Sequence, residues 1–377
     1  MAKVNIGDIA HKAGVSKTAV SFAFNNPSRL SAATVQRILS IARELGYHPD
    51  PIARSMSTRR TGTIGVLVPQ PIPEIIRNPF LPEFLEGIGQ VCTEAGLSLM
   101  IVPPLKGSIQ RAIDNAAVDG FVTLGLEEHK AAMVVLRLRG VPFVTVDSDP
   151  IEGVPAINID DEGGAKKAMI TVLSMGHRDI VIMAIRSGRR GHYKEYKGTL
   201  HFRMNGYVAA LTEFGLTIDQ RRIKLVECVC TDNGGKSAFR NIWNSRHHPT
   251  AIVAMSDIIA IGAMNAAKEA GIWVPDDLSI VGFDDIPLAA LVNPPLTTIS
   301  QPRCRKGKLA AELLLSCIEG RLDSTHYVLQ TELIYRNSVC PPNHLSHRKS
   351  GNIINSHSAP SVDDQLNMPD GGSTIDL

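Results

Sequence analysis

Residues 4–25 read V-N-I-G-D-I-A-H-K-A-G-V-S-K-T-A-V-S-F-A-F-N and predict two short helices joined by a tight turn. Asn5 can cap the first helix, and Asp8 stands in the capping-box position three residues later. Gly14 stands where a helix can end in the left-handed conformation that glycine adopts easily, and Ser16 can cap the second helix. This helix-turn-helix pattern is typical of proteins that place the second helix in the major groove of duplex DNA.

A third helix is predicted after Ser31, with an apolar stripe that ends at Leu45. A generic three-helix bundle would show a similar pattern, because a short helix, a glycine turn and a second helix are a modest signal alone. Charge favours the DNA-binding interpretation. Residues 1–60 hold nine basic and three acidic residues, a net charge of +6, whereas the whole chain of 377 residues carries +2. A basic segment on a near-neutral chain is typical of a nucleic-acid-binding module.

After residue 62 the pattern alternates between strands and helices, which is typical of parallel sheets flanked by helices. The units are too many for one compact sheet, so we expect two similar α/β lobes. Ligands of such open sheets bind beyond the carboxyl ends of the strands. Strands are predicted at 64–68, 97–102, 120–124, 143–146, 180–185, 223–227, 251–255 and 278–283, and helices at 82–95, 163–175, 203–214, 257–270 and 306–318.

The composition is that of an ordinary globular protein, with 44% hydrophobic and 20% charged residues. Six cysteines are scattered without metal-ligand spacing and without a C-x-x-C motif, so we expect free thiols, no metal and no cofactor. No signal-peptide pattern precedes the first predicted helix, and no segment is long and apolar enough to span a bilayer. We therefore expect a soluble, cytoplasmic protein with no membrane partner.

Further motifs follow the helix-turn-helix in a fixed order: Y-H-P-D-P-I-A-R-S-M at 47–56, T-G-T-I-G-V-L-V-P at 61–69, V-D-G at 118–120, G-H-R at 176–178, R-M-N-G-Y at 203–207, S-D at 256–257, V-G-F-D-D at 281–285 and T-T-I-S-Q-P at 297–302. In this order and spacing the chain closely resembles the lactose-repressor (LacI/GalR) family of bacterial transcription regulators, from Val4 to about Pro341. The resemblance implies a type I periplasmic-binding-protein fold for the two lobes. It also implies a homodimer, a pseudo-palindromic duplex-DNA operator and a small-molecule effector between the lobes, such as a sugar.

The resemblance and the change of pattern near residue 62 together divide the chain into four parts. The C-terminal part is rich in polar residues and has no leucine heptads, so we expect a disordered tail and no tetramerising coil. The parts are a helix-turn-helix head (1–49), a hinge helix and linker (50–61), a two-lobed effector-binding and dimerisation domain (62–341) and the tail (342–377), the first lobe covering about 62–160 plus part of 291–320 and the second about 161–290 plus part of 321–341.

The resemblance places DNA contacts on the second helix and on the hinge. Lys17 can donate to guanine, and Thr18 can bond to base edges or phosphate. Phe22 departs from the polar residue of the best-known member; its ring can meet a thymine methyl, or it can pack in the small core. Met56 stands where the family inserts an apolar wedge into the minor groove, unless 50–60 is only a linker. The expected DNA-contacting residues are Ser16, Lys17, Thr18, Ser21, Phe22, Asn25, Arg54 and Met56.

The resemblance also places an effector site between the lobes. Arg203 matches the family position that grips the ligand, and a guanidinium can hold adjacent hydroxyls, a carboxylate or a phosphate in a forked geometry. Asp147 and Asp284 each follow a predicted strand and can accept hydrogen bonds from ligand hydroxyls. Asp257, beside Ser256, is expected to cap the helix that follows. The expected effector-binding residues are Asn78, Phe80, Asp147, Arg203, Ser256 and Asp284.

Two features of the effector region leave alternatives open. The segment 186–197 reads R-S-G-R-R-G-H-Y-K-E-Y-K, which is longer and more basic than is usual in the family at this point. It either lines the cleft and favours an anionic effector, or it is a solvated loop. Phe80 and Phe84 either stack on a sugar ring or pack in the core.

The sequence therefore predicts a ligand-responsive transcription regulator, most simply a repressor, and not an enzyme. The alternatives are a cytoplasmic sugar-binding protein without gene control, against which the basic head argues, and a regulator that its ligand activates or co-represses. No nucleophile elbow, H-E-x-x-H, Walker loop or dinucleotide-binding motif occurs. Asp284 and Asp285 could suggest glycoside hydrolysis, but successive side chains after a strand point apart and cannot face one another across a bond.

Overall fold

The structure, a computed structural model, describes residues 4–50, 55–56, 58–125, 130–186, 193–218, 221–321 and 324–342. The chain divides into two units, Met1–Pro342 and Asn343–Leu377. The expected polar tail therefore lies, except for Pro342, outside the described residues. Among the described residues, no helix combines the length and the apolar character needed to cross a membrane.

Three α-helices and a 3-10 turn form the N-terminal head. They are α1 (Ile6–Ala13), α2 (Lys17–Asn25), η1 (Pro27–Arg29) and α3 (Ala32–Glu44). Asn5 accepts a hydrogen bond from the backbone N–H of Gly7 at 2.7 Å, and Asp8 accepts one from the N–H of Asn5 at 2.9 Å. Gly14 ends α1 in the left-handed region, with φ of 62°. The predicted capping box and helix end are confirmed.

A small apolar core holds the head together. Ile9 of α1, Val20 of α2 and Ile38 of α3 are fully buried in one cluster. Phe24 packs against Tyr47 beside it, with ring centroids 5.6 Å apart. This core fixes which face of α2 is turned away from α1 and α3.

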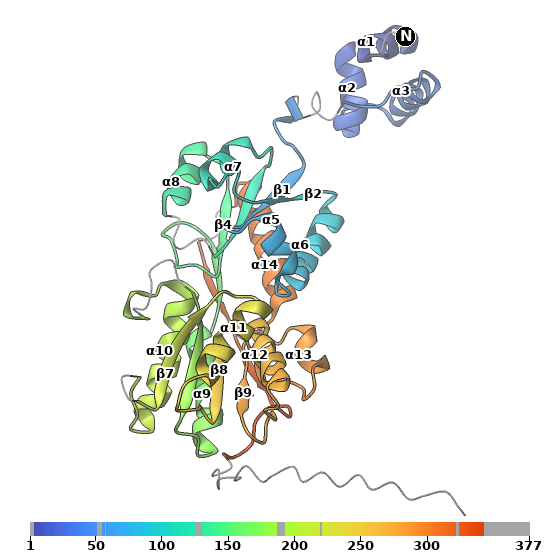
Figure 1. The fold of residues 1–377 in the computed structure, drawn as a ribbon. Helices are drawn as coiled ribbons and strands as arrows, with labels where there is room; N and C mark the ends of the chain where they lie inside the picture. The colour runs from blue at the N-terminus through green and yellow to red at the C-terminus, as the bar shows by residue number, and fades with distance from the viewer. Residues whose placement is uncertain are drawn as a thin grey trace, which may run out of the picture. The chain divides into compact units, whose positions relative to one another are not determined.

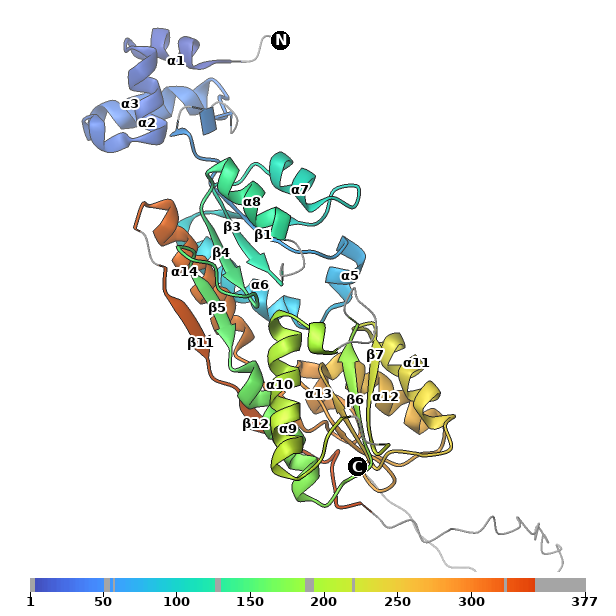
Figure 2. The same cartoon turned by 90° about the vertical axis from the view of Figure 1, so that its left-hand side faces the viewer.

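The first lobe is a parallel sheet between helices. Its elements are β1 (Thr63–Leu67), β2 (Ser98–Val102), β3 (Gly120–Leu124), β4 (Phe143–Val146), β5 (Ala156–Ile159), β11 (His326–Leu329), α5 (Ile72–Arg77), α6 (Leu81–Ala95), α7 (Ile109–Asn115), α8 (Lys130–Arg139) and α14 (Arg303–Ile318). The strand order is β11-β5-β4-β3-β1-β2 (Figures 1 and 2). Ile64 shares a buried cluster with Phe84 of α6 and Leu314 of α14, whereas Phe121 shares one with Ile113 of α7. Helices thus cover both faces of this sheet.

The second lobe repeats this arrangement with four strands. Its elements are β6 (Ile180–Ile185), β7 (Ile223–Cys228), β8 (Ala251–Ala254), β9 (Ser279–Val281), α9 (Asp161–Ser174), η2 (Tyr193–Glu195), α10 (Gly198–Glu213), α11 (Asp232–Trp243), α12 (Asp257–Glu269) and α13 (Pro287–Leu291). The parallel order is β7-β6-β8-β9. Ile182 shares a cluster with Tyr207 of α10, and Met183 shares one with Phe239 of α11 on the other face. The predicted two-lobed α/β fold is confirmed.

Three chain segments connect the lobes: β5 leads into α9, β10 (Thr298–Ser300) leads into α14, and β11 leads into β12 (Glu332–Ile334). β10 and β12 pair with each other as a short antiparallel ribbon. Asp284, just after β9, forms an isolated parallel bridge with Ser300. The strand ends of the second lobe are therefore tied directly to the connecting segments.

Helices α6 and α14 cross very closely because both have glycine at the contact. A Cβ atom at Gly87 would lie 1.9 Å from the carbonyl oxygen of Cys304, and one at Gly307 would lie 2.0 Å from that of Phe84. Among the described residues outside its own stretch of helix, no atom lies within 4 Å of the Cβ position of Gly89, which is also on α6. Only Gly87 is therefore required by packing against α14.

We expect Gly87→Ala to lower the free energy of unfolding by about 3 kcal/mol, because the obstructing atom belongs to the backbone of α14 and the helices must separate. Gly89→Ala should leave stability unchanged or raise it by up to about 1 kcal/mol, because alanine is the better helix former. Urea unfolding of both variants measures the difference. Equal stabilities would contradict the close crossing.

Candidate functional site

A cavity of about 180 Å³ lies beyond the carboxyl ends of strands from both lobes. Its lining includes all six residues expected to bind an effector: Asn78, Phe80, Asp147, Arg203, Ser256 and Asp284. The cavity is also lined by residues that the sequence did not predict to bind an effector: Val68, Gln70, Ile75, Leu81, Leu124, Gly125, Ile185, Thr199, Cys230 and Gln301. Open α/β sheets place ligands at this edge, so the location agrees with the general rule.

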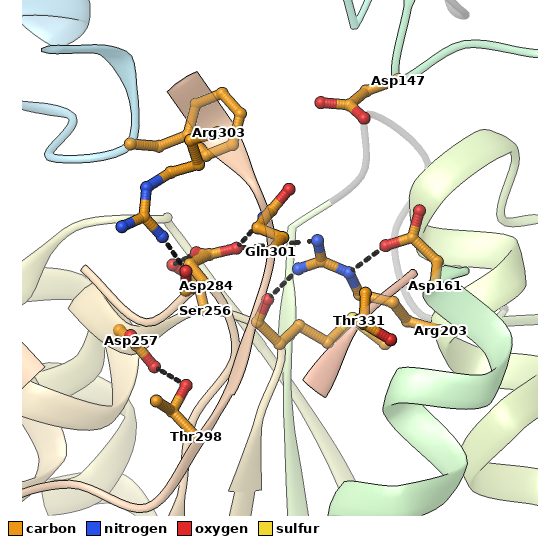
Figure 3. A network of polar contacts seen from close by, with 12 residues as sticks. Asp147, Asp161, Arg203, Ser256, Asp257, Asp284, Thr298, Gln301, Arg303 and Thr331 are labelled. Atoms are coloured by element: carbon orange, nitrogen blue, oxygen red, sulfur yellow. Dashed lines mark hydrogen bonds and ion pairs between the residues drawn. The ribbon is translucent and has the colours of Figure 1, made fainter. Parts of the chain in front are cut away.

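Arg203 of α10 is the buried cation of this cavity, with 5% of its surface exposed. Its Nε donates to Asp161 at 2.7 Å, one of its terminal nitrogens donates to the carbonyl oxygen of Met255, and the other lies 3.7 Å from the carboxylate of Asp284. Its guanidinium lies 3.6 Å from the ring centroid of Phe283. Figure 3 shows the side chain extending from Asp161 toward Asp284. The flanking carboxylates hold a forked donor at the wall of the cavity.

Arg203 stays protonated in this environment. Burial alone would lower its pKa, but the carboxylates of Asp161 and Asp284 outweigh burial, so the pKa is raised. Burial raises the pKa of Asp161 to about 6, against the opposing effect of Arg203. The guanidinium therefore stays charged, whereas the ionisation of Asp161 depends on pH in the physiological range.

Asp284 is held in one orientation by two neutral donors. Ser256 Oγ donates to one carboxylate oxygen at 2.9 Å, and Gln301 Nε2 donates to the other at 2.6 Å. The backbone of Asp284 has φ of 122°, a conformation that side-chain-bearing residues rarely adopt. Asp285 instead accepts from Arg336 at 2.7 Å. The two neighbouring carboxylates face different partners, as the sequence predicted.

Asp147 directly follows β4 and also has a positive φ, 53°. Both of its carboxylate oxygens accept from Lys306 Nζ of α14, at 2.7 and 2.9 Å. The sequence did not predict this partner. Asn78, at the end of α5, accepts from the backbone N–H of Phe80 at 3.1 Å, which orders the first-lobe wall.

The expected helix cap at Asp257 is wrong. Helix α12 begins at Asp257 itself, so the cap position is Ser256, whose hydroxyl bonds to Asp284. The Asp257 carboxylate is fully buried and accepts from the backbone N–H of Ile286 at 2.9 Å and from the hydroxyl of Thr298 (Figure 3). It ties the loop after β9 to the connecting ribbon, which no local pattern encodes.

Burial, together with the nearby carboxylate of Asp284, raises the pKa of Asp257 to about 7, against an ordinary value of 3.8. The folded state therefore binds a proton on Asp257 more tightly than the unfolded state does. This proton binding stabilises the folded state fully below about pH 4, and the stabilisation is lost as the pH rises to about 7. We expect the wild type to lose stability relative to Asp257→Asn between pH 5.5 and pH 7.5. Urea unfolding at several pH values measures this difference, and a constant difference would contradict the raised pKa.

In the head, α2 turns its expected DNA-contacting face away from the core. Lys17 and Thr18 are exposed, and Ser16 is engaged as the cap, accepting from the N–H of Ala19 at 3.1 Å. Farther along the same face lie Ser21 and Asn25, 3.4 Å apart between Oγ and Nδ2.

Phe22 is half-buried and is not part of the head core. Its ring lies under the guanidinium of Arg29, 5.1 Å from the centroid. The aromatic residues that pack against the core are Phe24 and Tyr47. In the hinge, Met56 is 79% exposed, whereas Arg54 lies outside the described residues.

The basic segment 186–197 is described only in part, because 187–192 lie outside the described residues. Its end is anchored: Tyr196 is buried and its hydroxyl donates to Glu227 at 2.6 Å. Phe84 is fully buried and stacks against Phe80, with ring centroids 6.1 Å apart, so only Phe80 reaches the cavity.

A helix-turn-helix head and a two-lobed core with a cavity between the lobes define a DNA-binding regulator with a ligand-binding domain. The model of the lacI family of bacterial regulatory proteins matches residues 5–50, and that of the periplasmic-binding-protein-like domain matches residues 171–339. The chain belongs to the LacI family of bacterial transcription regulators.

Two relatives match along nearly their whole length. The HTH-type transcriptional regulator Rv3575c of Mycobacterium tuberculosis is 32% identical, over 90% of this chain and 98% of the relative. The HTH-type transcriptional repressor CytR of Escherichia coli is 33% identical, over 88% of this chain and 95% of the relative.

Solved structures agree with the fold. A complex of the transcriptional regulator CelR with cellobiose is 26% identical, covers 89% of this chain and 100% of the other, and has a TM-score of 0.65. A lac repressor dimer bound to operator and the anti-inducer ONPF covers 90% and 100%, with a TM-score of 0.75; at 24% identity this likeness concerns the fold alone.

Proposed function

We propose that this regulator is a cytoplasmic repressor that binds a pseudo-palindromic operator as a homodimer and is controlled by a small neutral effector, such as a sugar, in the cavity between its lobes. The observation that carries the proposal is that the six residues expected to bind the effector come from distant parts of the sequence and line the same cavity. The CelR relative binds cellobiose, which supports a sugar-like ligand.

The charges around the cavity favour a neutral ligand. Arg203 is paired with Asp161, and Lys306 is paired with Asp147, so a carboxylate already balances the charge of each cation. Asp147 and Asp284 line the cavity with carboxylate oxygens, which accept hydrogen bonds from hydroxyl groups. An anionic ligand would have to displace a buried carboxylate from its partner, which is costly. A hydroxylated, uncharged ligand meets no such barrier.

Calorimetric titration with neutral sugars, cellobiose and ribose among them, and with their phosphate esters tests the effector assignment. We expect a neutral sugar to bind and its phosphate ester to bind at least about tenfold more weakly, the equivalent of about 1.4 kcal/mol. Tighter binding of the ester would contradict the assignment and would favour the anionic effector that the basic segment 186–197 suggests.

For the head, we propose that Lys17 and Thr18 contact base edges, that Ser21 and Asn25 contact phosphates and that Ser16 caps the helix beside them. Phe22 would meet a thymine methyl, with Arg54 and Met56 contacting DNA from the hinge. Footprinting on the DNA upstream of the chain's own gene tests this arrangement. Two symmetric half-sites about one helical turn apart are expected, and a single asymmetric footprint would contradict the dimer.

A further inference from the structure

Helix α14 presents two buried cations on one face of its first turn. Arg303 is 4% exposed and Lys306 is fully buried, and residues three apart on a helix lie on the same side. Lysine is almost never fully buried unless it is paired. Neither residue belongs to the cavity lining, yet both contact residues that do.

Lys306 joins the first-lobe wall to the segment that connects the lobes. Its Nζ donates to both carboxylate oxygens of Asp147, at 2.7 and 2.9 Å, and to Gln301 Oε1 at 2.7 Å. The same Nζ lies 5.2 Å from the ring centroid of Phe80, a further lining residue. Three lining residues thus depend on one ammonium group.

The chain of contacts continues into the second lobe. Gln301, which accepts from Lys306, donates in turn to the carboxylate of Asp284 at 2.6 Å. Arg303 donates to the carbonyl oxygens of Asp284 and Asp285, the latter at 2.7 Å, and is itself held by Glu83 of α6 at 2.9 Å. Asp147 and Asp284, both labelled in Figure 3, lie at the two ends of this chain of contacts. Both have positive φ values.

We infer that the first turn of α14 couples the two halves of the cavity, with Lys306 and Arg303 as positioning residues for Asp147 and Asp284. A ligand that draws Asp147 away from Lys306 leaves a buried ammonium group short of partners, and its remaining bond to Gln301 must change with it. Contact in one lobe is in this way transmitted to the carboxylate of the other. The regulatory role of this coupling rests on the proposed function, because it requires that the cavity bind an effector.

A double-mutant cycle on unfolding measures this coupling without DNA or ligand. The cycle combines two substitutions, Asp147→Asn and Asp284→Asn, made singly and together. It is carried out in three backgrounds: the wild type, Gln301→Leu and Lys308→Met. The last background is the control, because Lys308 is an exposed lysine on the same helix. In the wild type and in Lys308→Met, we expect the shift in urea midpoint of the double variant to differ from the sum of the single shifts. In Gln301→Leu the shifts should add.

Gln301→Leu removes the bridge without changing any charge, so direct repulsion between the two carboxylates would survive it. Additive shifts in the wild type, or non-additive shifts that persist in Gln301→Leu, would overturn the inference. Should a variant of the cycle fail to fold, hydrogen exchange of Lys306→Met against Lys308→Met replaces it. Faster exchange is expected in both 143–150 and 281–290, and a rise confined to the first segment would overturn the coupling.

A functional readout separates coupling from mere packing. With a sugar that releases the operator, Lys306→Met should reduce the change in operator affinity at least about tenfold, whereas Lys308→Met should retain it; equal responses of the two variants would contradict the regulatory role. If no sugar binds, the proposed function fails while the unfolding cycle still decides the coupling.

Discussion

Replacing Arg203 with methionine is expected to weaken effector binding about 100-fold and to leave operator binding intact. The guanidinium lines the cavity and offers charged hydrogen bonds, each of which contributes about 1.5–3 kcal/mol. The same change leaves Asp161 and Asp284 buried without their cation, which should lower the free energy of unfolding by about 3–5 kcal/mol. Calorimetric titration with the sugar that binds the wild type, and urea unfolding, measure the two effects.

Arg222→Met is the matched control, because Arg222 pairs with Asp179 at the surface, at 2.6 Å. An exposed ion pair contributes at most about 1 kcal/mol, so this variant should keep both its stability and its effector affinity. Unchanged effector affinity in folded Arg203→Met would place the binding site elsewhere.

Replacing Met56 with alanine is expected to weaken operator binding by about 30- to 100-fold while effector binding stays unchanged. Met56 is a large apolar side chain that is 79% exposed, and a side chain of this kind can separate base steps in the minor groove. Alanine removes the proposed wedge but favours a helical backbone, so the loss reports the side chain and not the backbone of the hinge. Fluorescence anisotropy on the operator duplex measures the operator affinity, and calorimetric titration measures the effector affinity.

Met56→Leu serves as the partner variant, because leucine keeps an apolar side chain of similar size. Its operator affinity should stay within about threefold of the wild type. If Met56→Ala binds the operator as tightly as Met56→Leu does, the segment acts as a linker and the wedge is wrong.

Features that depend on local sequence were predicted well. Asn5, Ser16 and Ser31 cap their helices because a cap requires only the side chain and the next three backbone N–H groups. The strands 120–124 and 143–146 have the predicted bounds because an apolar run between turns is a local signal.

Elements that form through distant partners were missed. β10 and β12 are three residues long each and exist because they pair with one another, 34 residues apart by their first residues. The same limit applies to the site. Asp147 and Asp284 follow strand ends and could be expected, but Lys306 binds Asp147 only because α14 returns to the first lobe. The wrong prediction for Asp257 has the same cause. A carboxylate at the start of a helix has the local pattern of a cap, but here it accepts a hydrogen bond from a distant loop instead.

The central claim is that a ligand in the cavity controls DNA binding by the head, and fluorescence anisotropy with the chain's own upstream duplex tests it most directly. The wild type and Arg203→Met are titrated at fixed salt, with a scrambled duplex as reference, in the presence and absence of neutral sugars. We expect tight binding to the upstream duplex by both proteins, and release by one sugar from the wild type alone. Equal release from both proteins, or binding that no sugar changes, would contradict the account.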